Sequence, residues 1–88
     1  MKRNKLEIIR DILEIINKNN NSITITPLIR KSNLSTTRFN SYFLELLRKN
    51  FVIERERNNK RYLSLAPKGF QYLERYSSII GFIEEFEL

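Results

Sequence analysis

The sequence contains no cysteine, no histidine and no tryptophan. Without cysteine the chain has no disulfide, no thiol nucleophile and no cysteine-ligated zinc, and without histidine it has no imidazole base and no histidine metal ligand. These absences remove most hydrolytic and metal chemistry, so we expect neither a metal nor a cofactor. Glycine and proline are scarce, with two residues each, which leaves no Gly-rich phosphate loop and no flexible linker.

Long apolar runs are also missing. Nowhere do about 18 apolar residues follow one another, as a membrane-spanning helix requires. The basic start, residues 1–5, precedes a segment interrupted by Glu7, Arg10, Asp11 and Glu14, which does not fit a signal peptide. We therefore expect a soluble, intracellular, cytoplasmic protein with no membrane partner. Its 88 residues are enough for one domain with a single modest core.

Basic residues are in excess and are unevenly placed. The chain has 16 Lys plus Arg against 10 Asp plus Glu. Residues 18–68 hold 11 of these cations against three glutamates, a net charge of +8, whereas residues 69–88 hold one cation against four glutamates, a net charge of −3. A basic balance favours an anionic partner but says nothing about the fold.

The first third of the chain predicts two helices. Over residues 3–18, apolar side chains recur with the helical period at Leu6, Ile9, Ile12, Leu13 and Ile16, with Ile8 and Ile15 widening the stripe. A polar cluster at 19–22 ends this helix, and residues 23–25 predict a very short β-bridge segment. Thr26 can then cap a second, short helix over 27–32, because Pro27 fits a first helical position.

A third helix is predicted between Leu34 and Asn50, with Ser35 as its N-cap and Asn50 closing its end. Its core face carries apolar residues at helical spacing: Phe39, Tyr42, Phe43, Leu46 and Leu47. The opposite side carries short hydrogen-bonding groups, cations and one leucine: Thr36, Thr37, Arg38, Asn40, Ser41, Leu44 and Arg48. No acid stands among them before Glu45, so this face can enter a groove lined with acceptors and phosphates. An ordinary solvated helix face would carry the same residue types.

A β-hairpin follows the third helix. Residues 51–57 and 61–65 alternate between apolar and polar side chains, and residues 58–60 predict the turn, because asparagine tolerates left-handed backbone angles. The tip carries Arg57, Lys60 and Arg61, which together would form a basic wing. The alternative interpretation is that charged hairpin edges only discourage pairing with other sheets.

The last helix, predicted over 67–86, carries a wide apolar stripe. Tyr72, Tyr76, Ile79, Ile83 and Phe86 follow the heptad rhythm of a helix–helix seam. We predict a homodimer interface at Tyr72, Tyr76, Ile79, Ile80, Ile83 and Phe86. Part of the stripe could instead fold back onto the first helix, and Gly81 could kink or stop the last one. We therefore expect the chain to have two parts. Residues 1–69 would form a DNA-binding domain, and residues 70–88 would form a dimerisation helix packed on it.

The predicted fold is mainly α with a small β-hairpin wing (α+β), a winged helix-turn-helix of order α-α-α-β-β-α. Residues 33–53 and 62–69 resemble the small archaeal winged-helix proteins typified by the ten-kilodalton crenarchaeal DNA-binding chromatin protein. The resemblance covers the chain from Lys5 to about Tyr76. It is carried by the N-L-S start of the third helix, the L-x-L-L-x-K-x-x-x-I pattern that ends at Ile53, and the L-x-P-K-G exit from the wing.

This resemblance implies a homodimer joined through the last helix, with the third helix and the wing on double-stranded DNA. The chain departs from the family pattern at two positions, since Ala66 replaces the usual threonine and Asn50 the usual glycine. The first change removes an N-cap, and the second fits only if asparagine accepts a left-handed turn. The last helix is also short for the family.

Two classes of function remain open. As a regulator or nucleoid-associated protein, the chain would contact phosphates through its helix and wing cations and base edges through the start of the third helix. The predicted DNA-binding residues are Arg30, Lys31, Thr36, Thr37, Arg38, Asn40, Ser41, Arg48, Arg57, Lys60 and Arg61. As a protein-interaction winged helix, it would dock a partner on Leu44 or the aromatic tail. An enzyme is not expected, because no paired-carboxylate site is specified, and no small-molecule ligand is predicted.

Overall fold

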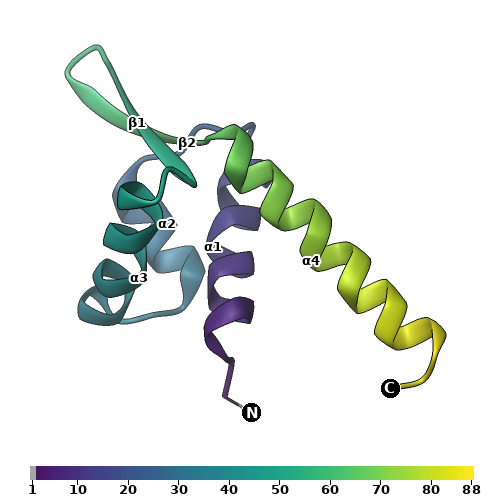
Figure 1. Ribbon diagram of the computed structural model, residues 1–88. Coiled ribbons are helices and arrows are strands. Elements are labelled where there is room, and N and C mark those ends of the chain that lie inside the picture. Colours follow the sequence, from purple (N-terminus) through teal and green to yellow (C-terminus); the bar gives the residue numbers. More distant parts are fainter. Residues whose placement is uncertain (1) are drawn as a thin grey trace.

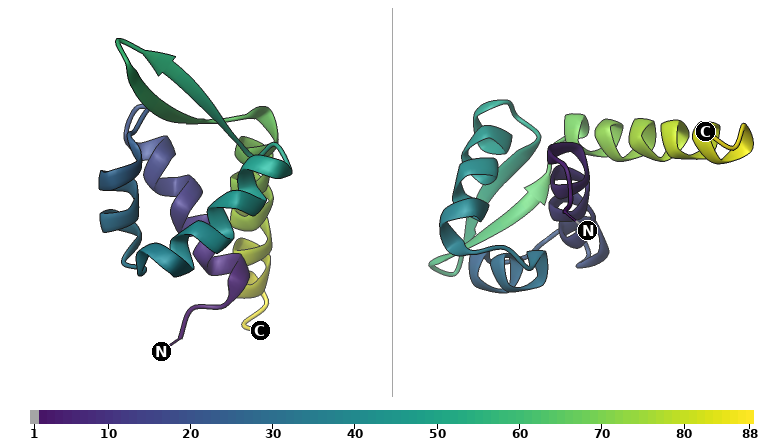
Figure 2. Two further views of the ribbon diagram at one scale, coloured as in Figure 1. Left: turned by 90° about the vertical axis from the view of Figure 1, so that its left-hand side faces the viewer. Right: turned by 90° about the horizontal axis from the view of Figure 1, so that it is seen from below.

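The computed structural model describes residues 2–88 and has the predicted order of elements (Figure 1). The elements are α1 (Lys5–Lys18), α2 (Ile25–Ser32), α3 (Thr36–Arg48), β1 (Val52–Arg57), β2 (Lys60–Leu65) and α4 (Pro67–Glu85). The first three helices and the base of the hairpin surround the core, and α4 projects away from them (Figures 1 and 2). This projection makes the molecule elongated, with extents of 49 × 26 × 21 Å.

Helix α1 supplies the largest share of the core. It begins with a capping box, in which the Asn4 side chain accepts from the Glu7 N–H and the Glu7 carboxylate accepts from the Asn4 N–H. Its buried residues are Ile8, Ile9, Ile12, Leu13 and Ile16. Two details differ from the prediction. Ile8, expected at the margin of the stripe, is 1% exposed, whereas Leu6 is 57% exposed, because Leu6 lies on the side of α1 that lines an open groove beside α4.

The start of α2 also differs from the prediction. Because α2 begins at Ile25, Thr24 rather than Thr26 occupies the N-cap position, and its side chain makes no capping hydrogen bond. Pro27 is therefore the third residue of the helix. It still costs no hydrogen bond, since the first four N–H groups of a helix have no intrahelical partner. Of the predicted bridge segment only Ile23 pairs, with Leu63 of β2.

Asparagine occupies all but one of the left-handed backbone positions in residues 2–88, the exception being Glu87; such positions usually favour glycine. The six asparagines with positive φ are Asn20, Asn21, Asn33, Asn50, Asn58 and Asn59. Asn33, at φ 60°, ends α2 and opens the turn to α3, and Asn50, at φ 63°, ends the α3 segment as predicted. Asn58 and Asn59 form the hairpin turn, where both central residues need φ above zero. The short polar side chain of asparagine makes this conformation tolerable.

The hairpin has one register and is tied to the loop before α2. Its strands are antiparallel, with Val52 opposite Leu65 at the base and Arg57 opposite Lys60 at the tip. Asn21 links the loop to β2 twice: its carbonyl accepts from the Ser64 hydroxyl and its side-chain oxygen accepts from the Leu65 N–H, both at 2.7 Å. These bonds fix the hairpin relative to the helices.

The core combines the predicted apolar residues with several that the sequence pattern missed. The predicted residues Phe39, Phe43 and Leu46 are buried, and Leu47 is half-buried; Leu28 of α2 and Leu63 and Leu65 of β2 join them in the core. Ile23, Val52 and Ala66 are buried as well. So is Ser32, whose hydroxyl donates to the Ile29 carbonyl at 2.6 Å and is therefore not left unpaired.

Helix α4 runs without a break through Gly81 and ends at Glu85, with Phe86 as its C-cap. Ala66 gives it no side-chain cap, as the sequence predicted. At the other glycine, Gly69, an added Cβ would lie 2.5 Å from the Phe51 carbonyl oxygen, so this turn of α4 fits only a residue without a side chain. No helix within residues 2–88 is long and apolar enough to cross a membrane.

The two glycines of α4 therefore give a matched test of this packing. Gly69→Ala should destabilise the protein by roughly 1–3 kcal/mol, because the new methyl group forces the Phe51 carbonyl to move. Gly81→Ala should stabilise it by about 0.5–1 kcal/mol, because nothing lies within 4 Å of the new atom and alanine favours the helix. Urea unfolding of both variants measures the difference, and equal stabilities would contradict the close approach at Gly69.

Candidate nucleic-acid interface

Helix α3 turns one face to the core and the other to solvent. Phe39, Phe43 and Leu46 are buried, and the rings of the two phenylalanines stack with centroids 5.2 Å apart. All the α3 residues predicted to contact DNA are exposed, namely Thr36, Thr37, Arg38, Asn40, Ser41 and Arg48. The structure thus leaves the whole predicted reading face accessible.

The start of α3 is fixed locally. The Ser35 hydroxyl accepts a hydrogen bond from the Arg38 N–H at 3.2 Å, which makes Ser35 the N-cap as predicted. The Ser41 hydroxyl donates to the Arg38 carbonyl at 2.9 Å. Each hydroxyl keeps free hydrogen-bonding capacity, because a hydroxyl can both donate and accept.

The one acid on α3 is neutralised. Both Lys5 of α1 and Lys49 donate to Oε1 of Glu45, at 3.0 and 3.1 Å. These two hydrogen bonds lower the pKa of the Glu45 carboxyl below its ordinary value, so it stays ionised while its charge is offset by two ammonium groups. The exposed face of α3 therefore meets a ligand with no unbalanced negative charge.

The three predicted wing cations do not share one face of the hairpin. Side chains alternate along a strand, so Arg57 and its cross-strand neighbour Lys60 lie on one face and Arg61 on the other. Arg55, which was not among the predicted wing cations, lies on the same face as Arg57 and Lys60. The Arg57 guanidinium lies 5.0 Å from the centroid of the Tyr62 ring, a cation–π contact that orients it.

Arg61 faces α3 instead. It forms a weak ion pair with Glu54 at 3.6 Å, and both residues line a hollow of about 260 Å³ together with Asn40 and Leu44 of α3. Leu44 is 63% exposed at the edge of this hollow. The structure therefore brings the α3 face and one side of the wing together into a single concave surface. Figure 2 (left) shows α3 crossing the front of the molecule below the hairpin.

Arg30 and Lys31 lie exposed in the last turn of α2, the helix that precedes α3. Lys31 Nζ is 3.5 Å from the Asn19 side-chain oxygen, which is a long and exposed hydrogen bond. Arg30 and Arg48 form no ion pair with any residue of the 2–88 segment. These cations are thus available to an anionic ligand.

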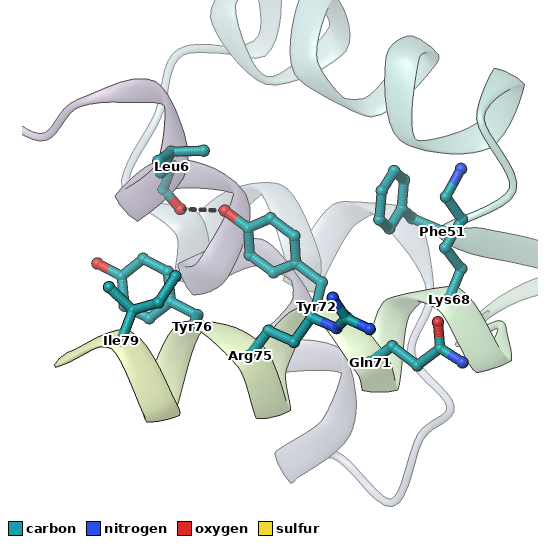
Figure 3. Close-up of a pocket in the computed structure, with 8 residues that line it drawn as sticks. All are labelled: Leu6, Phe51, Lys68, Gln71, Tyr72, Arg75, Tyr76 and Ile79. Carbon is teal, nitrogen blue, oxygen red and sulfur yellow. Dashed lines mark hydrogen bonds between the residues drawn. The ribbon is translucent and has the colours of Figure 1, made fainter. Parts of the chain in front are cut away.

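The six residues predicted for a dimer interface fall into two groups. Tyr72 and Tyr76 are half-buried against α1, with their rings stacked at 6.2 Å. The Tyr72 hydroxyl donates to the Leu6 carbonyl at 2.7 Å, and burial raises the pKa of this hydroxyl, which keeps it protonated for that bond (Figure 3). The Arg10 guanidinium lies 5.1 Å from the centroid of the Tyr76 ring.

The second group lies beyond these tyrosines. Ile80 is half-buried, while Ile79, Ile83 and Phe86 are 60%, 38% and 57% exposed. Phe82, which was not among the predicted interface residues, is 55% exposed, and the centroid of its ring lies 4.8 Å from that of the Phe86 ring. Phe82 follows Ile79 by three residues and precedes Phe86 by four, and this helical spacing could have identified it from the sequence. We call Ile79, Phe82, Ile83 and Phe86 the α4 apolar face.

Next to this face, a groove of about 280 Å³ separates α4 from the start of α1 and from Phe51 (Figure 3). Its walls are the apolar parts of Leu6, Tyr72, Tyr76 and Ile79, with Lys68 and Arg75 at the rim. Within residues 2–88 no three acids lie close enough to hold a metal ion.

Comparison with known proteins identifies the fold. The solved structures most relevant to it include Sso10a-2, a DNA-binding protein from Sulfolobus solfataricus, with 19% identity over 97% of this chain and 86% of that one, at a TM-score of 0.75. F93 from STIV, a winged-helix DNA-binding protein, has 16% identity over 90% of this chain and 91% of its own, at a TM-score of 0.74. SSV1 F-93 has 22% identity over 97% and 99% of the two chains, at a TM-score of 0.67.

These identities are low, so the three structures are similar to this chain in fold. No curated protein matches the sequence significantly. A family model described as winged helix-turn-helix matches residues 2–84, which includes every helix and strand except the last residue of α4. The chain therefore belongs to the winged helix-turn-helix family.

Proposed function

We propose that this chain is a dimeric double-stranded DNA-binding protein that acts as a transcription regulator or a nucleoid-associated protein. The observation that carries the proposal is the concave surface of α3 and wing, where Glu45 and Glu54 are each paired with a cation and the third acid, Glu56, stands opposite Arg61 in the hairpin. The solved structures of the same fold support it, since two of them are described as DNA-binding proteins. The protein would act in the cytoplasm, and its resemblance to archaeal and viral winged-helix proteins favours an archaeal or viral source.

In this proposal α3 enters the major groove and the wing follows the backbone. Phosphates would be bound by Arg30, Lys31, Arg48, Arg57, Lys60 and Arg61, which fix the position of the protein on the duplex. Base edges would be approached by Thr36, Thr37, Arg38, Asn40 and Ser41. Asparagine suits adenine and arginine suits guanine, through paired hydrogen bonds in the major groove.

The dimer in this proposal forms through the α4 apolar face. Burying each such side chain is worth roughly 1.5–3 kcal/mol, and a contiguous exposed patch of this kind marks an interaction site. A two-fold axis between the last helices leaves α3 free on both copies, since α4 projects away from α3 (Figure 2, right). The two α3 helices would then need a spacing of about 34 Å to reach successive major grooves. Residues 1–69 would bind DNA and residues 70–88 would join the copies.

A protein-interaction role is the second candidate, and Leu44 is the observation that favours it. A leucine that is 63% exposed on a polar helix face would suit an apolar pocket of a partner protein. The DNA-binding role explains the cations around Leu44, whereas in the protein-interaction role these cations would serve only solubility. Catalysis forms no part of either candidate.

The salt dependence of DNA binding distinguishes these two candidate functions. With about six phosphate contacts per dimer, that is, about three made at one time by the six candidate residues of each copy, log K for duplex DNA should fall against log salt with a slope near −5, because bound counterions are released. Fluorescence anisotropy on specific and random duplexes across a salt series measures this slope. A flat response, or no binding at low salt, would favour the protein-interaction role.

Substitutions can separate the residues that position the protein on the duplex from those that read the base sequence. Arg57→Ala or Lys60→Ala should weaken binding to all duplexes about equally, whereas Arg38→Ala or Asn40→Ala should change any sequence preference by about 1–3 kcal/mol per lost paired contact. Lys18→Ala, which removes a charge at the far end of α1, is the control. Loss of binding in the wing variants together with no effect from α3 would show that α3 is not the reading helix.

Charges placed on the α4 apolar face test whether this face joins two copies of the chain. Ile79→Glu with Ile83→Glu should convert a dimer to a monomer, because four charges would be buried at one interface. Ser77→Glu with Gly81→Glu adds the same charge to the opposite side of α4, where a side chain at position 81 meets nothing within 4 Å, and should leave the dimer intact. Light scattering gives the mass of each. A soluble monomer in the unmodified protein would exclude the dimer.

A further inference from the structure

The segment before α1 is held against two helices by Arg3. One Arg3 nitrogen, Nη1, donates to the Asp11 carboxylate at 2.8 Å, and the other, Nη2, donates to the Ser32 carbonyl at 3.0 Å. Asp11 belongs to α1 and Ser32 is the last residue of α2, so one guanidinium ties the segment to both. The Arg3 side chain is only 30% exposed, which makes this bridge partly shielded from water.

The residue after Arg3 is fixed as well. Asn4 is the N-cap of α1, with an extended backbone and both hydrogen bonds of the capping box. Two consecutive anchored residues restrict where the backbone of Lys2 can lie. Figure 2 (left) shows the segment passing below the beginning of α3.

Lys2 and Arg38 meet at one hollow. It has a volume of about 600 Å³ and is lined by Lys2, Arg3, Ile8 and Arg38. The charge of Arg3 is matched by Asp11, whereas Lys2 and Arg38 are exposed and form no ion pair with any residue of the 2–88 segment. Two unmatched cations therefore face a space that no acid lines.

We propose that this hollow binds a phosphate of the DNA backbone, with Lys2 as its contact, Arg38 as the neighbouring cation that makes the hollow positive, and Arg3 as the residue that positions Lys2. The proposal rests on the DNA-binding function and adds a contact outside α3 and the wing. A phosphate fits because Arg38 stands in the first turn of α3, where the positive end of the helix dipole also attracts an anion. When α3 lies in the major groove, the strand that borders the groove passes beside this end.

The central experiment measures DNA affinity and its salt slope for Lys2→Ala in the full chain. Affinity for specific and random duplexes should fall together, by on the order of tenfold at 0.1 M salt, and the slope should become shallower by about two for a dimer that loses two contacts. Lys18→Ala, with the same charge loss at the far end of α1, should leave both quantities unchanged.

The positioning role of Arg3 needs its own measurement. Arg3→Ala should lower affinity and salt slope as Lys2→Ala does, and the double variant should be no weaker than either single one, because Lys2 acts only when Arg3 holds it. Urea unfolding at the DNA-binding temperature confirms that the variants are folded during the titration. Independent, multiplying losses in the double variant would overturn the positioning role.

Failure of this inference is distinguishable from failure of the proposed function. If the unmodified protein binds DNA with a steep salt slope and Lys2→Ala behaves like Lys18→Ala, the hollow is not a phosphate site and the DNA-binding function stands. If the unmodified protein does not bind duplex DNA at low salt, both are overturned.

Discussion

The buried side of α1 is the constraint on which the rest of the structure depends. Ile12, Leu13 and Ile16 are completely buried, and α2, α4 and β2 all pack against this helix. Helix α3 reaches α1 through the Lys5–Glu45 ion pair, in addition to its apolar contacts in the core. A small domain has one core and little surplus stability. Loss of apolar volume along α1 would therefore affect the position of every element that carries a candidate DNA contact.

The second constraint is backbone conformation without glycine. Six tight positions are occupied by asparagine at φ between 53° and 63°. One of them, Asn21, also uses its side chain and carbonyl to hold β2. The hairpin is thereby fixed at its base, while its tip projects beyond the helices (Figure 1). This arrangement gives a wing whose cations are exposed but whose direction is set by hydrogen bonds near the core.

Charge and apolar surface are divided between opposite parts of the molecule. The exposed cations of α2, α3 and the wing lie on the body, and the α4 apolar face lies on the projecting helix. Such a division suits a protein that meets an anionic surface with one side and a second copy with another, because neither contact covers the other. Tyr72 and Tyr76 connect the two parts, since they join α4 to α1 through the Leu6 carbonyl and Arg10.

The sequence alone determined the elements, because periodicity, capping residues and asparagine turns act over a few neighbouring residues. It predicted the order α-α-α-β-β-α, the Ser35 cap and an exposed polar face on α3. Tertiary structure decided what depends on long-range packing: the start of α2 at Ile25, the burial of Ile8 in place of Leu6, and the division of the wing cations between two faces. It also decided which α4 side chains cover α1 and which stay exposed. The Arg3 bridge joins residues 29 positions apart, and no local pattern encodes a contact at that separation.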